Sequence, residues 1–360
     1  MLKRWISAAL AAAALVAVPL TAGFDRAEAE TKKYRVGYNI YVGFMPYGWM
    51  AENGILDKWA KKYGIEIEVI QVADYVGGIN QFVARDLDAM SVASMDGLTI
   101  PAAGGVDTTI ALAGDFSNGN DGILSKSASS IKDLKGETVH LFELTVSHYL
   151  LSRALEAEGM TLRDVKTVNI TDADIGPAYI GSDEVQHAVT WNPILLQMEE
   201  AVDGDKRIFD SASTPEEIVD VMLFHTDTVE KEPEFVKAFV GAWYETMEIM
   251  NGGDEAAEKM IADLADMSGD TVEGFKAQLA STKMYYTPQE ALDLMNSDGH
   301  KQVWDFVRTF SYDVGLFGEN APSKDFVGIE FPDGTVLGDT DNIMLRINST
   351  FTDMAVKGEL

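Results

Sequence analysis

The sequence contains no cysteine. It therefore has no disulfide framework, no thiolate metal site, no thiol nucleophile and no cysteine that could carry a lipid anchor. Basic residues are also scarce, because 28 Lys and Arg stand against 58 Asp and Glu and give a formal net charge of -30. A chain this acidic repels nucleic-acid phosphates and anionic lipid, so we expect neither as a partner.

Apolar runs long enough to cross a membrane are lacking after the N-terminus. There, Lys3 and Arg4 precede an apolar run from Ile6 to Leu20, and the small-x-small triplet Ala27-Glu28-Ala29 follows. This order is typical of a secretory signal that is cleaved after Ala29, and the run is shorter than the roughly 20 residues of a membrane span. An uncleaved anchor helix is the alternative. We expect a signal peptide at residues 1–29 and a periplasmic location.

Motifs of catalysis and metal binding are missing as well. The histidines do not show the paired spacing of a zinc site, and the segment from Asp115 to Asp121 lacks the glycine and glutamate of a calcium loop. No G-x-S-x-G elbow, P-loop or dinucleotide fingerprint is present. We therefore expect no metal, no cofactor and no enzymatic activity, with a periplasmic hydrolase on the same fold as the alternative class.

The remaining pattern alternates between strands and helices. Strands are predicted at residues 34–39, 65–70, 89–93 and 108–113, separated by helices, and the alternation restarts with strands at 122–125, 138–142, 165–169 and 185–190. Such βαβα order predicts parallel sheets covered by helices. From Pro233 onward we expect helices at 234–251, 255–265, 271–279, 288–296 and 301–314, which complete the first lobe or form a separate helical domain.

Several segments of the chain resemble the periplasmic solute-binding proteins of ABC importers, in the nitrate, taurine and sulfonate class. The class likeness lies in Ala51 to Leu56, Ile79 to Ala89 and Ile131 to Val139. Within it, the chain is similar to the branch whose genes accompany urea or guanidine carboxylases, by the segments Tyr41 to Gly48, Asn118 to Gly122, Ser147 to Leu151 and Thr190 to Pro193.

The resemblance implies an α/β, two-lobed periplasmic binding protein fold, type II-like, with ligand in the cleft between the lobes. Residues 30–116 and 225–360 would form lobe 1 and residues 117–224 lobe 2, with the chain crossing near Phe116 and returning near Phe224. The implied partners are a small-molecule ligand and a permease in the inner membrane, and the protein would be a monomer.

Residues that follow the predicted strands are the candidate ligand contacts, because ligands of parallel α/β sheets lie beyond the carboxyl ends of the strands. Asp172 and Asp174 also satisfy this rule, although loop positions account for them equally well. The candidates that we retain are Tyr41, Asp74, Asp96, Asp115, Glu143, Trp191 and Asn192.

Each of the acids also has an ordinary structural interpretation. Asp74 and Asp96 precede helices and suit N-caps, Asp115 suits a hinge turn, and Glu143 suits the dipole of a following helix. Trp191 is equally compatible with the core.

Carboxylates together with aromatic residues favour a small planar nitrogenous cation, and guanidinium fits best. Urea or another amide, and a small anion such as nitrate or a sulfonate, are the alternatives.

Overall fold

A computed structural model of the chain describes residues 31–318 and 321–360. The signal peptide predicted at residues 1–29 lies outside them. Within the described residues, no helix combines the length and the apolar character that crossing a membrane requires.

Fourteen strands are present in the described part of the chain. They are β1 Lys33–Tyr38, β2 Glu66–Gln71, β3 Ala89–Ala93, β4 Thr108–Ser117, β5 Asp121–Ser125, β6 Thr138–Leu141, β7 Lys166–Asn169, β8 His187–Trp191, β9 Lys206–Asp210, β10 Val219–His225, β11 Thr282–Met284, β12 Gly328–Glu330, β13 Val336–Leu337 and β14 Ile343–Ile347.

The α-helices of the described residues lie between and after these strands. They are α1 Met45–Glu52, α2 Ile55–Tyr63, α3 Tyr75–Val83, α4 Ser94–Gly97, α5 Val146–Ala157, α6 Asp172–Gly181, α7 Ile194–Ala201, α8 Thr226–Lys231, α9 Pro233–Met250, α10 Glu255–Ser268, α11 Val272–Ala280, α12 Pro288–Met295, α13 Asp298–Asp313 and α14 Thr350–Lys357.

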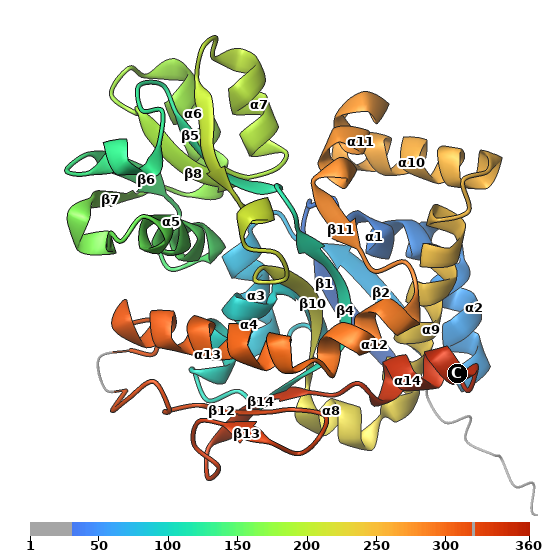
Figure 1. The fold of residues 1–360 in the computed structure, drawn as a ribbon. Helices are drawn as coiled ribbons and strands as arrows, with labels where there is room; N and C mark the ends of the chain where they lie inside the picture. Colours follow the sequence, from blue (N-terminus) through green and yellow to red (C-terminus); the bar gives the residue numbers. More distant parts are fainter. Residues whose placement is uncertain (1–30, 319–320) are drawn as a thin grey trace, which may run out of the picture. The chain divides into compact units, whose positions relative to one another are not determined.

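The strands form two mixed sheets. The larger has the order β13-β12-β14-β4-β10-β3-β1-β2, with β11 paired to β4, and the smaller has the order β7-β6-β8-β5-β9. In Figure 1 the middle of the chain, in green, forms the smaller sheet, while both ends of the colour range lie with the larger one. Segments far apart in the sequence therefore share one sheet.

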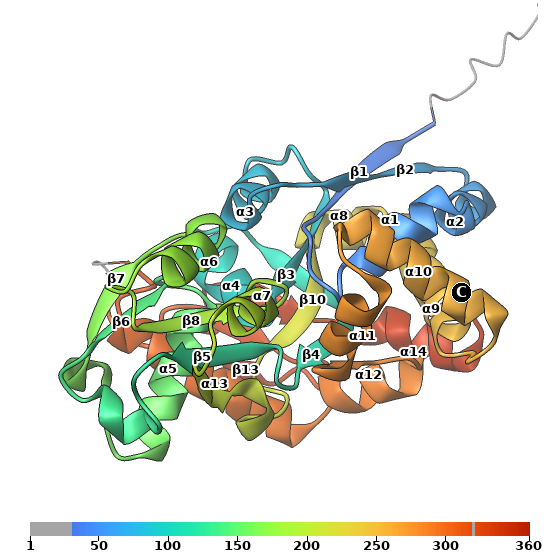
Figure 2. The ribbon, with the colours of Figure 1, turned by 90° about the horizontal axis from the view of Figure 1, so that it is seen from above.

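Buried strands form the centre of each sheet. Every residue of β3, β4, β5, β8 and β10 is buried, which explains their continuous apolar runs. Where only one face is covered, side chains alternate, as in β1 and β2. Figure 2 shows the larger sheet with α1, α2 and α9 beside one part of it and α3 beside another. The C-terminal helices therefore do not form a separate domain.

Strand β10 was not predicted, and it changes the character of the larger sheet. It lies between β3 and β4 and runs antiparallel to both, whereas β1 is parallel to β2 and β3. The expectation of a mainly parallel sheet therefore needs correcting to a mixed sheet, because the chain re-enters from the smaller sheet and runs in the opposite direction. Strands β9 and β11 to β14, with helices α6, α7 and α14, were also not predicted.

Two segments carry the chain between the sheets, one between β4 and β5 and the other between β9 and β10. They are joined by a hydrogen bond between the Ser117 and Ser211 hydroxyls at 2.6 Å and by the Gly119 N–H donating to the Ser211 hydroxyl at 2.8 Å. We keep the two-lobe division as a proposal. Because β10 belongs to the larger sheet from Val219 onward, we propose to place the return crossing between Asp210 and Val219 rather than near Phe224.

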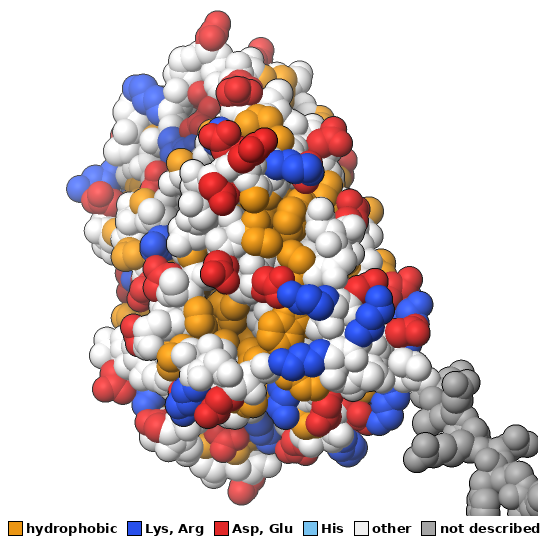
Figure 3. All heavy atoms as spheres, turned by 90° about the vertical axis from the view of Figure 1, so that its right-hand side faces the viewer, with side chains coloured by type: hydrophobic (Ala, Val, Ile, Leu, Met, Phe, Trp, Pro, Cys, Tyr) orange, Lys and Arg blue, Asp and Glu red, His pale blue; other side chains and the backbone are white. Residues whose placement is uncertain are grey.

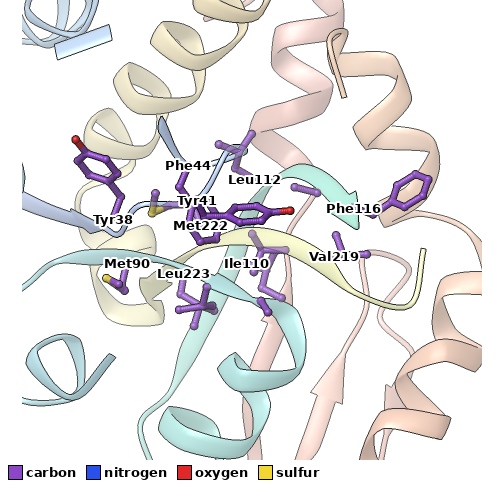
Figure 4. Packing of buried hydrophobic residues seen from close by; sticks show 14 of the residues in the cluster. Tyr38, Tyr41, Phe44, Met90, Ile110, Leu112, Phe116, Val219, Met222 and Leu223 are labelled. Atoms are coloured by element: carbon purple, nitrogen blue, oxygen red, sulfur yellow. The ribbon is translucent and has the colours of Figure 1, made fainter. Parts of the chain in front are cut away.

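Side chains of β4 and β10 pack together at the centre of the core. Figure 4 shows Ile110 and Leu223 below the ring of Tyr41 and Leu112 above it, and the Tyr41 hydroxyl points toward the Phe116 and Val219 end. Leu112 and Met222 are fully buried and sit opposite one another. This packing fixes the register that positions the polar residues at the ends of both strands.

We expect Leu112→Ala to lower the free energy of unfolding by about 2–5 kcal/mol, because the vacated volume cannot be refilled by its neighbours. Val356→Ala is the control, since Val356 is 38% exposed, and it should cost less than about 1 kcal/mol. Differential scanning calorimetry measures both. Equal melting temperatures for the two variants would contradict the central position of Leu112.

Candidate functional site

A small cavity lies where residues from both sheets meet. Its polar lining is Asn39, Tyr41, Tyr75, Asp121 and Asp220, and its apolar lining is Phe44, Ala93, Val146, Trp191 and Ile218. Asp121 begins β5 and Trp191 ends β8 in the smaller sheet, whereas Asp220 belongs to β10 in the larger one. Both sheets therefore contribute to one site.

The cavity measures about 40 Å³. Because one water molecule needs roughly 10–15 Å³ on this measure, the cavity has room for about three or four groups of the size of a water molecule. Larger grooves of 490 to 940 Å³ exist on the described surface. They contain none of the buried carboxylate oxygens that lack a hydrogen-bond donor, which is why we consider the small cavity the candidate site.

Asp115 and Asp220 form a pair of facing carboxyl groups. They are register partners on the antiparallel strands β4 and β10, and each carboxyl group affects the pKa of the other. Asp115 is fully buried and Asp220 is 5% exposed. The Tyr41 hydroxyl donates a long hydrogen bond, 3.5 Å, to Oδ1 of Asp115. Asp220 lines the cavity, while Asp115 lies directly behind it and Tyr41.

Asp121 connects the cavity to the crossing segments. Its Oδ2 accepts a hydrogen bond from the Ser117 hydroxyl at 2.5 Å, and the Ser117 hydroxyl also bonds to that of Ser211. Oδ1 of Asp121 is buried without a partner. A ligand that contacts Asp121 therefore contacts a group held by both segments that join the two sheets.

Asp96 lies behind Tyr75 in the same way as Asp115 lies behind Tyr41. The Tyr75 hydroxyl donates to Oδ2 of Asp96 at 2.8 Å and accepts a hydrogen bond from the Ala93 N–H at 2.9 Å. These two bonds fix the orientation of the ring at the cavity wall. Oδ1 of Asp96 has no donor.

Burial raises the pKa of all four carboxyl groups, because an ionised carboxylate loses its hydration inside the protein. It raises the pKa of Asp96 and of Asp115 to about 7 and that of Asp121 to about 6, and hydrogen bonds from Tyr75, Asp220 and Ser117, respectively, oppose the rise. Burial, followed by the charge of Asp115, raises the pKa of Asp220 well above its usual range. Asp220 therefore holds a proton more readily than a carboxyl group in water.

The cavity region has an excess of acceptors. Four buried oxygens lack a donor, namely Oδ1 of Asn39, Oδ1 of Asp96, Oδ2 of Asp115 and Oδ1 of Asp121. No Lys, Arg or His is among the lining residues. Basic side chains occur at the surface instead, often next to acidic ones, as on the face in Figure 3. The lining of the cavity therefore carries no positive charge.

Metal coordination does not follow from this excess of acids. Within residues 31–318 and 321–360, no group of three or more His, Asp or Glu side chains is placed to hold a metal ion. The carboxylates are distributed around the cavity rather than converging on a point, which suits a ligand with several donor atoms better than a single ion.

Four of the seven residues predicted from the sequence are at or directly behind the cavity: Tyr41 and Trp191 line it, while Asp96 and Asp115 are the partners of lining residues. Their ligand-binding roles remain predictions. Asp115 is not in a turn, as its ordinary interpretation suggested, but inside strand β4.

The other three predicted residues are not among those that line the cavity. Asp74 is the exposed N-cap residue of α3, although its side chain accepts no capping bond. Glu143 borders a separate surface groove, and Thr145 caps the helix that follows it. The amide of Asn192 donates to the Ser281 hydroxyl at 3.1 Å and accepts from the Leu196 N–H at 3.2 Å, which gives Asn192 a structural role.

Asp121 and Asp220 line the cavity but were not predicted as ligand contacts. Asp121 was included in the turn that suggested a calcium loop and in the segment that resembles the urea or guanidine branch, but not as a ligand contact. Asp220 lies in the strand that the sequence pattern did not predict. An apolar stretch interrupted by one acid, Val219-Asp220-Val221, is the signal that could have identified Asp220, because an acid in a buried strand requires a special environment.

We expect Gly43→Ala to displace the acid pair, because its Cβ would lie 2.1 Å from Oδ2 of Asp115. Such overpacking should lower the free energy of unfolding by about 1–3 kcal/mol. Gly181→Ala is the matched control, since nothing lies within 4 Å of its added Cβ. If calorimetry finds the two variants equally stable, the close approach at Gly43 is wrong.

Asp96 should make the stability of the ligand-free chain depend on pH. Because its folded pKa of about 7 exceeds the unfolded value of about 3.9, the folded chain keeps a proton that the unfolded chain loses between these values. The stability from this group is complete below about pH 4 and falls as the pH rises to 7.

We therefore expect Asp96→Asn to gain stability relative to the wild type, by on the order of 2 kcal/mol, between pH 5 and pH 8. Calorimetric unfolding of both proteins at the two pH values measures this difference. A difference that is the same at both pH values would contradict the raised pKa.

Sequence comparison relates the chain to known proteins. Residues 58–257 match the family described as NMT1/THI5 like. Over 200 residues, 54% of the chain, the sequence is 28% identical to the taurine-binding periplasmic protein of Escherichia coli (strain K12). The matched stretch spans 61% of the length of that relative.

Solved structures share the fold at lower sequence identity. The periplasmic aliphatic sulphonate-binding protein SsuA from Escherichia coli superposes with a TM-score of 0.66 at 18% identity, covering 81% of this chain and 94% of that one. The periplasmic nitrate-binding protein NrtA from Synechocystis PCC 6803 gives a TM-score of 0.57 at 14% identity, covering 91% and 99%. With a family match over more than half of its length, this chain belongs to the NMT1/THI5-like family and has the mixed α/β, two-sheet fold of periplasmic binding proteins.

Proposed function

We propose that the chain is the periplasmic solute-binding component of an ABC importer and that its cavity captures a small planar nitrogenous cation, guanidinium. The ligand would then be delivered to a permease in the inner membrane. The family and the fold support the transport role. The guanidine or urea branch of the resemblance remains a prediction.

The observation that carries the proposal is that two buried acids, Asp121 and Asp220, line a cavity with no basic lining residue, and that Oδ1 of Asp121 is buried without a donor. Guanidinium has three nitrogens that donate hydrogen bonds along the edges of a plane, and it brings the positive charge that the site lacks. Charge-assisted hydrogen bonds of this kind are among the strongest that a protein makes. Its one carbon and three nitrogens also suit a cavity of about 40 Å³.

Aromatic side chains in the lining supply faces for a planar cation. Tyr41 and Phe44 come from the loop after β1, and Trp191 comes from the end of β8 in the other sheet. The Tyr41 and Phe44 rings are already packed edge to face, with centroids 4.9 Å apart. A cation between these rings gains the attraction of their π-systems in addition to its hydrogen bonds.

An anionic ligand suits this cavity poorly. Relatives and structural neighbours are named for taurine, sulphonate and nitrate, but those oxygens need donors or positive charge. Here an anion would meet Asp121, whose pKa of about 6 leaves it ionised at neutral pH. In a buried site, the electrostatic repulsion between the anion and Asp121 exceeds the stabilisation that hydrogen bonds from the tyrosine hydroxyls could provide.

Urea is the second candidate, and one observation favours it. The raised pKa of Asp220 favours its protonated form, and a carboxyl proton can be donated to the single carbonyl oxygen of urea. Urea has the planar shape of guanidinium but no charge, so it leaves the ionised carboxylates of the site uncompensated.

We expect guanidinium at low-millimolar concentration to bind the mature chain saturably in calorimetric titration. Asp121→Asn should weaken the affinity roughly 10- to 100-fold, because it removes one charge-assisted hydrogen bond worth about 1.5–3 kcal/mol. The matched control is Asp74→Asn, which removes an exposed acid outside the cavity and should leave the affinity unchanged.

If both variants bind like the wild type, or if Asp74→Asn is the weaker one, the cavity is not the site. Ligand recovered chemically unchanged after long incubation agrees with a binding protein, and conversion of the ligand would favour the alternative class, a hydrolase.

A further inference from the structure

The facing pair Asp115 and Asp220 is the feature from which we draw a further inference, which rests on the proposed function. Both carboxyls are buried and stand opposite each other on neighbouring strands, and each affects the pKa of the other. Two ionised carboxylates repel each other and offer only hydrogen-bond acceptors, so they can share a hydrogen bond only with a proton between them. One proton shared by the ligand-free pair relieves this repulsion.

The pair has no room to separate. Gly43 lies so close to Asp115 that a Cβ there would be 2.1 Å from Oδ2, and the strand register holds Asp220 opposite. The Tyr41 hydroxyl restrains the other oxygen of Asp115. Because the two carboxyls cannot move apart, only a proton or another positive charge relieves their repulsion.

The groups around the pair do not supply that positive charge. The ionisable side chains that interact electrostatically with the pair are Asp121, Tyr41, Tyr47, Tyr75, Tyr285 and Tyr286. All of them are acidic or phenolic, so none can take over the role of the proton. A cation that enters the cavity beside Asp220 is the group that can.

We infer that guanidinium binds by exchange, in which one cation enters beside Asp220 and the proton shared by Asp115 and Asp220 leaves to solvent. No bond other than that of the acid proton breaks, and the charge of the site is the same before and after. The exchange makes the pair the element that selects for charge, because neutral urea has the same shape but cannot replace the proton.

Calorimetric titration of the mature protein in two buffers of different ionisation enthalpy tests the exchange. At about pH 6, guanidinium should release close to one proton per molecule bound, and its affinity should rise about tenfold per pH unit below the titration of the pair. If urea binds, it should release none. Equal heats for guanidinium in both buffers, with an affinity that is flat from pH 5 to pH 8, would overturn the exchange.

The Asp115→Asn variant distinguishes the proton exchange from the effect of merely removing an acidic side chain. Its amide N–H donates to Asp220 permanently, so guanidinium should bind with little proton release and a flattened pH dependence. Asp121→Asn is the matched control, because it removes an acid outside the pair and should weaken binding while keeping the release of a proton. Proton release that persists in Asp115→Asn and is lost in Asp121→Asn would contradict the inference.

The outcomes also separate the inference from the function on which it rests. If wild-type guanidinium binding occurs without proton release, the exchange fails and the proposed ligand stands. If guanidinium does not bind at any pH, the proposed ligand fails and the exchange fails with it. Calorimetric unfolding verifies that Asp115→Asn folds, and if it does not, the two-buffer comparison on the wild type decides.

Discussion

Burial of several carboxyl groups without a basic partner is the constraint on which the rest of the site depends. Asp96, Asp115, Asp121 and Asp220 are all at most 5% exposed, and an ionised carboxylate in such surroundings is costly unless it is paired. Hydroxyl groups of Tyr41, Tyr75 and Ser117 donate hydrogen bonds to these acids, and the pKa values of the carboxyl groups are raised. Oδ1 of Asp121, which lines the cavity, remains without a donor, and a ligand bound there must supply one.

The topology explains why these acids meet. Asp115 and Asp121 lie on either side of the first crossing between the sheets, and Asp220 is the second residue of the strand that follows the second crossing. The hydrogen bond between Ser117 and Ser211 joins the two crossings directly beneath Asp121. A ligand that changes the charge in the cavity therefore acts on the segments about which the two sheets would move. A receptor that closes around its ligand needs the ligand to act at this place.

Much of the fold followed from the sequence pattern, and the limits of prediction have physical causes. Strand β3 has the bounds that the sequence pattern predicted. Strand β10 was missed, although all seven of its residues are buried, because its partners β3 and β4 are distant in sequence and local pattern does not reveal them. Asp220 was missed with it. Tyr41, Asp96, Asp115 and Trp191 could be chosen from strand ends, whereas it took the three-dimensional contacts to place Glu143 and Asn192 outside the lining of the cavity.

The central claim is that this member of a family with relatives named for anions has a cavity for a cation. Parallel calorimetric titrations of residues 30–360 with guanidinium chloride, sodium nitrate and taurine compare both signs of charge on one site. The account predicts saturable heat from guanidinium, with none from nitrate or taurine. Saturable binding of nitrate or taurine, with no response to guanidinium, would contradict it.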